Sequence, residues 1–326
     1  MTDGRRSHSR AARRWIAVIA FTTALFLVAT GMLLLLGGRP QKPAATRVVV
    51  AHAADPSAVA ALPDGAFRYT ERRTGRIREV DRRGRLRAAL VASVQVRSSP
   101  GQRGLLGLAV DRHDATFAAW TRRTDGRLVV GQVAPGATRL VWVGPPSAEL
   151  ANGGRLAFAP DGRLLLGVGD LQRPDRTSDP GAPNGKLLLL DSQREPTQTP
   201  RVLTSGWNNP FAFTYGPGNR LWVADNAPGQ RPERITRGDR RAAPVATTGS
   251  FRPLAPAALV PLGRERLGLC GYVSRVMREV HIDGDRPERP GRVLVEKCAV
   301  AAAVLPDRRA VVTDDDTIRI TTQPLH

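Results

Sequence analysis

A short pattern, in which a tight turn separates two apolar runs, recurs six times along the chain. The clearest copy is AFAPDGRLLLGVGD at residues 157–170, where the turn is Pro-Asp-Gly. The six turns lie near positions 63, 112, 160, 217, 261 and 306, so the spacings are 44 to 57 residues. Strand-turn-strand units repeated every ~40–50 residues are typical of propeller blades. The repeat therefore predicts an all-β fold, a six-bladed β-propeller.

The segments between the turns agree with this prediction. Short apolar runs bounded by Gly, Pro, Asp or Asn, such as RLWVAD and RVLVE, are typical of strands, and no helical periodicity continues past residue 37. Six blades fill residues 51–326 and leave no second domain. The glycines in ANGG at 151–154 look like a phosphate loop, but such a loop opens a helix. Between two strands they are instead expected at the start of an inner strand, beside the central channel, where backbone can approach a ligand closely.

The N-terminal region predicts one membrane span. Five arginines within residues 1–14 precede an uncharged run of 22 residues, 15–36. As a helix this run would be about 33 Å long, enough to cross a hydrocarbon core of ~30 Å. Its length favours an uncleaved anchor over a cleaved signal peptide. Because basic flanks stay inside, we expect a cytoplasmic tail at 1–14, a transmembrane helix at 15–37, a proline-containing stalk at 38–50 and an extracytoplasmic propeller at 51–326, in a single-pass protein of the cell membrane.

The net charge of +20 raises the question of nucleic-acid binding. Residues 1–47 account for +7 of it, and the remaining charge is scattered, without a basic block or interleaved aromatic residues that could stack on bases. A solvated, arginine-rich surface explains this distribution better, so no nucleic-acid partner is predicted. No protein partner is indicated either.

Two cysteines, Cys270 and Cys298, lie in the part of the chain expected outside the cytoplasm. In an oxidising compartment an even pair favours a disulfide, because two thiolates without nearby histidines cannot complete a zinc site. The pair is expected to join blades five and six, across a loop of 28 positions.

Four segments resemble the soluble quinoprotein glucose and sorbosone dehydrogenase family: GQRGLLGLAVD (101–111), NGGRLAFAPDGRLLLGVGD (152–170), GKLLLLD (185–191) and NNPFAFTYGPGNRLWVADNAPG (208–229). The resemblance covers about residues 60–320. It implies a six-bladed propeller that binds pyrroloquinoline quinone (PQQ) and calcium and oxidises sugars outside the cytoplasm.

Several positions depart from the family pattern. Ala151 stands where the family has the histidine that removes the sugar hydroxyl proton, and Asn208 stands where an arginine pairs with the quinone. Cys298 and Val300 align with two further arginines, and Val273 lies near an expected lysine. Each charge-assisted hydrogen bond to the quinone carboxylates is worth roughly 1.5–3 kcal/mol, and a general base typically contributes ~10²–10⁴ in rate.

Other positions are kept. The resemblance places Gln102 and Asn209 near the quinone, and Asp170 where an aspartate orients the catalytic histidine. It also implies that backbone carbonyls around Ala227 and Pro228 bind calcium. Each of the three side chains has a structural alternative: Asp170 as a turn cap, Gln102 as a loop residue, and Asn209 as the residue before a proline.

Three functions remain open at this stage. The favoured one is a membrane-anchored propeller that has lost catalysis and binds a sugar or another small molecule. The second is a working quinone- and calcium-dependent aldose dehydrogenase with a rearranged site, in which Asp170 or His281 acts as base. The third is a basic module that binds anionic polymers or headgroups of the cell envelope.

Overall fold

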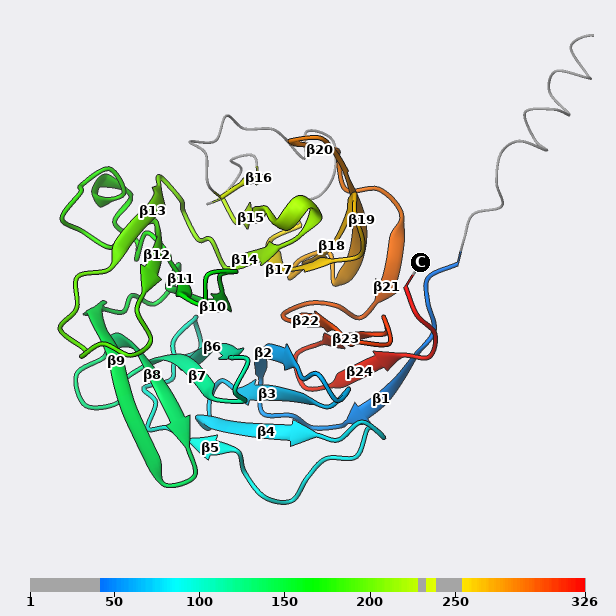
Figure 1. Cartoon of the computed structure of the whole chain (residues 1–326), viewed down its shortest axis with the longest axis horizontal. Coiled ribbons are helices and arrows are strands. Elements are labelled where there is room, and N and C mark those ends of the chain that lie inside the picture. Colours follow the sequence, from blue (N-terminus) through cyan, green and yellow to red (C-terminus); the bar gives the residue numbers. More distant parts are fainter. Residues whose placement is uncertain (1–41, 228–232, 239–253, 326) are drawn as a thin grey trace, which may run out of the picture. The chain divides into compact units, whose positions relative to one another are not determined.

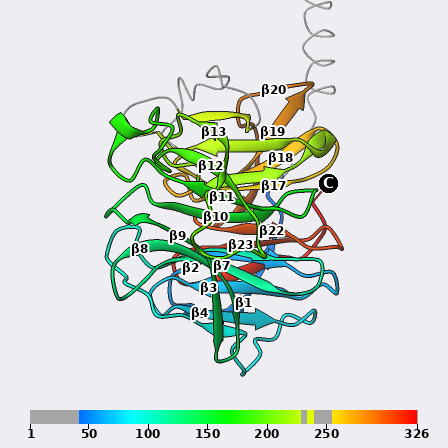
Figure 2. The same ribbon diagram turned by 60° about the vertical axis from the view of Figure 1, so that its left-hand side comes forward.

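The computed structural model describes residues 42–227, 233–238 and 254–325. Pro43–His326 form one compact unit, which is a six-bladed β-propeller (Figure 1). Each blade is an antiparallel sheet whose strands follow one another outward from the centre, and Figure 2 shows β10–β13 stacked in this order. The fold predicted from the repeat is confirmed.

The strands are grouped by blade. Blade one consists of β2 (Pro56–Ala61), β3 (Phe67–Glu71), β4 (Arg76–Val80) and β5 (Ala92–Ser93). Blade two consists of β6 (Leu105–Val110), β7 (Thr116–Thr121), β8 (Arg127–Ala134) and β9 (Ala137–Pro146). Blade three consists of β10 (Gly153–Phe158), β11 (Leu164–Val168), β12 (Lys186–Leu190) and β13 (Arg201–Ser205). Blade four consists of β14 (Ala212–Tyr215), β15 (Leu221–Asp225) and β16 (Arg234–Arg237). Blade five consists of β17 (Pro256–Pro261), β18 (Arg266–Gly271), β19 (Val276–Asp283), β20 (Arg286–Pro287) and β21 (Val293–Glu296). Blade six consists of β22 (Ala302–Val304), β23 (Ala310–Thr313), β24 (Ile318–Thr321) and, as its outermost strand, β1 (Thr46–Val50). Two single 3₁₀ turns, η1 (Pro174–Arg176) and η2 (Pro217–Asn219), lie in loops.

The six repeated turns are the six hairpins between the first and second strands of the blades. Each hairpin is closed by the same backbone hydrogen bond, from the residue after the inner strand to the carbonyl four positions on, with N···O distances of 2.8–3.0 Å. The six donors are Leu62, Asp111, Ala159, Gly216, Leu262 and Leu305. The repeat in the sequence is therefore a repeat of this turn.

The core lies between the blades. Six apolar clusters each combine residues of two neighbouring blades, so every sheet is covered on both faces. β11 illustrates the consequence for the sequence: Leu164 and Leu166 pack toward the second blade, whereas Leu165 packs toward the fourth. A strand covered on both faces reads as a continuous apolar run, as LLLGV does.

The predicted stalk at residues 38–50 is wrong in its second half. Thr46–Val50 form β1, the outermost strand of the last blade, and pair with β24 from Thr46↔Thr321 to Val50↔Ile318. In this chain a strand from the N-terminal end thus completes the blade formed by the C-terminal strands. This lone N-terminal strand lies outside the repeated turn pattern and so left no periodic signal. Among the described residues no helix is long and apolar enough to cross a membrane, and the tail and transmembrane segment predicted at 1–14 and 15–37 lie outside those residues.

Two ends of the propeller differ in what they carry. We call the end with the six hairpin turns the turn face, and the opposite end, where the chain leads into each inner strand, the cavity face. Since β24 ends next to the turn face and β1 pairs with it antiparallel, β1 begins at the turn face. The C-terminal segment also lies there, because the Leu325 N–H donates to the Arg308 carbonyl.

Candidate functional site

A cavity of about 260 Å³ opens at the centre of the cavity face. Its walls come from the inner strands, the segments that lead into them and, in three blades, the residue after the second strand (Arg72, Asn226 and Tyr272), and every blade contributes at least one residue. The lining residues are Asp55, Ser57, Arg72, Pro100, Gly101, Gln102, Leu106, Leu150, Gly153, Asn209, Phe211, Asn226, Ala255, Pro256, Ala257, Tyr272 and Val300. The volume is close to the lower end for small-molecule sites, ~300 Å³.

Gln102 and Asn209, both expected near a quinone, lie side by side in this wall. The Gln102 Oε1 accepts hydrogen bonds from the Ala151 backbone N–H at 2.7 Å and from the Asn209 amide at 3.5 Å. The Asn209 Oδ1 in turn accepts from the Gly153 N–H at 3.0 Å. These bonds join blades two, three and four, and they leave the Gln102 Nε2 without a hydrogen bond to any residue that the structure describes.

Ala151 lies between two cavity residues, Leu150 and Gly153, in a left-handed backbone conformation with φ of 54°. Its N–H is taken by Gln102, and its side chain is a methyl group. No proton acceptor is therefore present at the position that corresponds to the family's catalytic base.

Asp170 is not among the described residues that line the cavity; it is buried beside it, with 4% of its surface exposed. Its carboxylate accepts from the Gln172 N–H at 2.8 Å and from the Asn208 side-chain amide at 2.5 Å. Burial raises the pKa of Asp170, while these two hydrogen bonds lower it. The side-chain amide of Asn208, the residue that stands where the family has an arginine, thus occupies the Asp170 Oδ2. His281, the other base considered, is exposed on β19 opposite Arg266, near the turn face.

The only cation among the described lining residues is Arg72, and its donors are occupied. Its Nε and Nη2 contact Asp55, and its Nη1 is shared among three backbone carbonyls. These carbonyls belong to Ser99 (3.1 Å), Gly101 (2.5 Å) and Arg103 (3.0 Å). Arg72 therefore shapes the loop at 99–103 and keeps no free donor for a ligand. Asp55 is shared between Arg72 and the largely exposed Arg73, whose Nε lies 3.3 Å from the same carboxylate oxygen.

A second arginine lies below the cavity and was not singled out by the sequence. Arg155, on β10, donates to the carbonyls of Phe211 (2.9 Å), Ser57 (3.3 Å), Ala257 (2.7 Å) and Val300 (3.4 Å), and its guanidinium carbon lies 4.3 Å from the centre of the Phe211 ring. It thus joins the inner segments of five blades. Burial lowers the pKa of Arg155 to about 10. One arginine among 46 carries no recognisable motif, so only the structure reveals this role.

The predicted disulfide is confirmed. Cys270, in β18, and Cys298, in the segment before β22, are bonded with a Cα–Cα distance of 5.4 Å, and both are fully buried. The bridge joins blades five and six next to Val300, at the position where the family resemblance places cofactor arginines. Val273, near the expected lysine, is 55% exposed.

These donors do not fit a quinone with three carboxylates. Such a ligand needs guanidinium or ammonium groups with free N–H donors, but Arg72 is paired with Asp55 and Arg155 is held by backbone carbonyls. Asn208 is turned to Asp170, and Cys298 is in the disulfide.

Of the two residues predicted to bind calcium, Pro228 lies outside the described residues. Ala227 is half-buried just after β15. Within the described part of the chain no group of three or more His, Cys, Asp or Glu side chains could hold a metal ion.

A six-bladed propeller with a central cavity and the ANGG segment (151–154) at its edge has the architecture of the sugar-dehydrogenase class. The model of the glucose/sorbosone dehydrogenase family matches residues 53–239, more than half of the chain, and the protein belongs to this family. No curated protein sequence matches the chain.

Solved structures show the same fold. An oxidoreductase from Thermus thermophilus, described as a glucose dehydrogenase, is 24% identical, with a TM-score of 0.69, over 85% of this chain and 99% of that one. The PQQ-bound aldose sugar dehydrogenase of Streptomyces coelicolor is 20% identical, with a TM-score of 0.68, over 86% and 99%. The soluble aldose sugar dehydrogenase of Escherichia coli in its apo form is 19% identical, with a TM-score of 0.71, over 86% and 99%.

Proposed function

We propose that this protein is a membrane-anchored, extracytoplasmic propeller that binds a neutral, hydroxyl-rich small molecule of the sugar class and does not oxidise it through PQQ. The observation that carries this proposal is the chemistry of the cavity. Its only described cation is paired with its neighbouring carboxylate, and a methyl group stands at the position of the base.

The remaining polar groups of the cavity suit an uncharged ligand. The side-chain amides of Gln102 and Asn226 form no hydrogen bond through their nitrogen atoms with residues that the structure describes, and both line the cavity. The rings of Phe211 and Tyr272 provide apolar surface beside them. A few placed hydrogen-bonding groups among apolar and aromatic side chains are typical of small-molecule sites, and amides match hydroxyl groups as donors and acceptors.

Calorimetric titration of the purified full-length protein tests this function. We expect a panel of neutral mono- and disaccharides to include a ligand, and PQQ with calcium to show no binding at micromolar concentration. Gln102→Ala should weaken sugar binding by roughly 5-fold or more, because one hydrogen bond is worth about 1 kcal/mol. Gln193→Ala, which changes an exposed glutamine outside the cavity, is the matched control.

Two results would overturn the proposal. The first is PQQ-dependent oxidation of an aldose at more than about 1 per second, a rate typical of enzymes; Asp170 would then be the first base to replace. The second is sugar binding that Gln102→Ala and Gln193→Ala affect equally. The anchor has its own test: protease added to intact protoplasts should remove the propeller, and full protection would contradict the topology.

A further inference from the structure

The loop that follows β4 places a basic and apolar surface on the turn face. Arg82, Arg83, Arg85 and Arg87 are all exposed in the short segment RRGRLRAAL. Leu86, which lies between them beside Val80 at the turn-face end of β4, is 36% exposed. Leu90 is 39% exposed but lies beside the other end of β4, since the following Val91 N–H donates to the Ile77 carbonyl. Five other large apolar side chains of the described residues are more exposed, among them Val48 of the neighbouring β1 at 43%. Arginines interleaved with exposed leucines are typical of surfaces that lie at a membrane interface.

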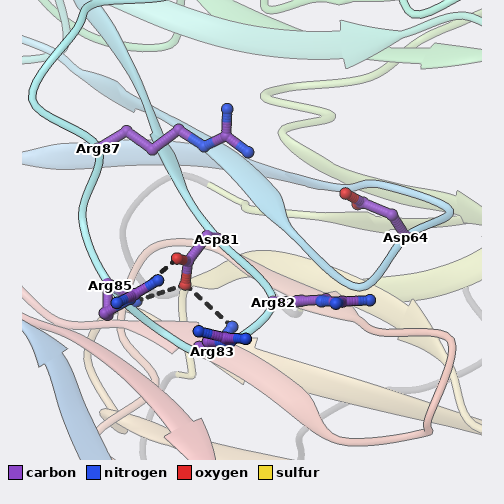
Figure 3. Close-up of a pocket in the computed structure, with 6 residues that line it drawn as sticks. All are labelled: Asp64, Asp81, Arg82, Arg83, Arg85 and Arg87. Carbon is purple, nitrogen blue, oxygen red and sulfur yellow. Dashed lines mark hydrogen bonds and ion pairs between the residues drawn. The ribbon is translucent and has the colours of Figure 1, made fainter.

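The arginines surround a shallow pocket of about 230 Å³, whose walls also include Asp64 and Asp81 (Figure 3). Figure 3 shows that Asp81 is engaged by Arg85 and by the backbone N–H of Arg83. Hydrogen bonds lower the pKa of Asp81, and the largest contribution comes from the Arg85 backbone N–H. The Asp81 carboxylate is therefore charged and already hydrogen-bonded to the loop.

The positive charge on this surface exceeds the negative charge. The side chains of Arg82 and Arg83 form no ion pair or hydrogen bond with any residue in the described ranges, whereas Arg87 contacts Glu79 at 3.0 Å. Glu79 is already paired with the buried Arg68.

A further guanidinium comes from β1. Arg47 Nη2 donates to the Arg83 carbonyl at 3.4 Å, so its charge lies against the loop. Five guanidinium groups therefore gather around three carboxylates, Asp64, Asp81 and Glu79, the last of which also pairs with Arg68.

The chain reaches β1 along the outer edge of blade five. Ala44 forms a bridge with Val295 of β21, and its N–H donates to the Leu294 carbonyl at 2.7 Å, before Thr46 begins β1. Six residues, 37–42, separate Pro43 from the uncharged run that ends at Leu36. Even fully extended, this linker spans no more than about 25 Å. If residues 15–36 cross the membrane as proposed above, Pro43 stays within that distance of the bilayer, and β1 begins only three residues further on.

We propose that the loop at 82–90, together with Arg47, docks on an anionic phospholipid surface: the arginines contact lipid phosphates and Leu86 enters the headgroup region. The inference rests on the proposed anchor for its geometry, and on the charge and exposure of the loop for its chemistry. Docking there turns the central cavity away from the bilayer, toward solutes outside the cell.

Hydrogen exchange of the full-length protein in lipid nanodiscs tests the proposal. Backbone amides of 82–90 should exchange more slowly in nanodiscs that contain phosphatidylglycerol than in phosphatidylcholine nanodiscs, and 0.5 M NaCl should remove the difference. The double variant Arg82→Gln, Arg83→Gln should lose most of this protection, because each arginine near an anionic surface contributes about 5-fold in affinity and two contribute roughly 30-fold. Arg97→Gln with Arg123→Gln, two exposed arginines outside this surface, is the matched control and should leave the protection unchanged.

The outcomes separate docking from anchoring. If the protein co-elutes with nanodiscs but residues 82–90 exchange equally in both lipids, the protein is anchored and the docking proposal is overturned. A protein that fails to enter nanodiscs contradicts the anchor; docking then still requires sedimentation with phosphatidylglycerol vesicles and not with phosphatidylcholine vesicles, and is overturned without it. Protection produced by 10 mM inorganic phosphate alone would show a phosphate site and overturn the lipid surface.

Discussion

The turn face and the cavity face of the propeller use hydrogen bonds of very different reach. On the turn face, aspartate side chains accept from backbone N–H groups two or four positions further on, as Asp111 does from His113 and Ala115. On the cavity face, side chains join segments far apart in the chain: Gln102 to Ala151 across 49 positions, and Arg155 to Val300 across 145.

This difference separates what each blade can form alone from what requires the whole ring. A turn whose hydrogen bonds lie within five residues forms with its own hairpin. The cavity is complete only when all six blades are in place, because every blade supplies part of its wall. Changes on the cavity face should therefore affect the stability of the ring, whereas changes on the turn face should stay local.

The largest expected effect is removal of the disulfide, which ties blades five and six at the cavity face. Replacing both Cys270 and Cys298 with serine should lower the free energy of unfolding by about 3–4 kcal/mol, since the bridge closes a loop of 28 positions. Urea denaturation measures this, and the wild type under reducing conditions should match the variant. A loss below about 1 kcal/mol would show that the ring does not depend on this bridge.

Replacement of the central arginine ranks second. Arg155→Met keeps most of the side-chain volume but leaves four backbone carbonyls without their donor. We expect a loss of about 2–3 kcal/mol in unfolding free energy. Arg163→Met, in an exposed turn, is the control and should change stability by less than about 0.5 kcal/mol. Equal effects of the two substitutions would remove the distinction between the faces.

The same distinction explains how far the sequence predicts the fold. The six turns are predictable because each is specified by a few adjacent residues, such as Pro-Asp-Gly at 160–162, and the disulfide because only one pairing is available. The role of Thr46–Val50 was missed because a strand that pairs with residues some 270 positions away carries no local signal.

The candidate site was predicted only in part, for the same reason. The resemblance pointed to Gln102 and Asn209, and both line the cavity. Arg155 was missed because its partners are backbone carbonyls, which leave no trace in residue identity. The contact between Asp170 and Asn208 was also missed, since it arises from a loop packing that links positions 38 apart.

A turn substitution should have a smaller, local effect. Asp111→Ala removes two hydrogen bonds of 2.8 Å in the hairpin between β6 and β7 and should cost about 1 kcal/mol. Asp111→Asn keeps the accepting oxygen and should recover most of it. Hydrogen exchange should show faster opening in this hairpin alone. Faster exchange in other blades as well would contradict the local character of the turn face.

The smallest effect is on the pH dependence of stability. A buried carboxylate at the cavity face, Asp170, and an ion-paired carboxylate at the turn face, Asp161, should contribute to it with opposite signs. Burial raises the pKa of Asp170, so the folded state binds its proton more tightly than the unfolded state, and the contribution of this residue to stability rises as the pH falls from 7 toward 4. The Arg163 side chain lowers the pKa of Asp161 in the turn, so this contribution is lost as the pH falls below about 4.

Thermal melts at several pH values check these signs against variants that cannot titrate. The stability of the wild type relative to Asp170→Asn should increase on acidification, whereas that relative to Asp161→Asn should decrease. A shift in the same direction for both variants would contradict the assignment of burial to one carboxylate and ion pairing to the other.

The strand that closes the ring also sets a timetable for folding. Thr46 is made among the first residues of the propeller, but its partner Thr321 is made among the last. At ~5–20 residues per second, synthesis of the intervening chain takes on the order of 15–55 s. During that time β1 has been made but its partner β24 has not. The unpaired edge of β1 must therefore be kept from pairing with strands of other chains. Ring closure therefore waits until Ile318–Thr321 have been made, and a chain that lacked these residues would leave β1 without its partner strand.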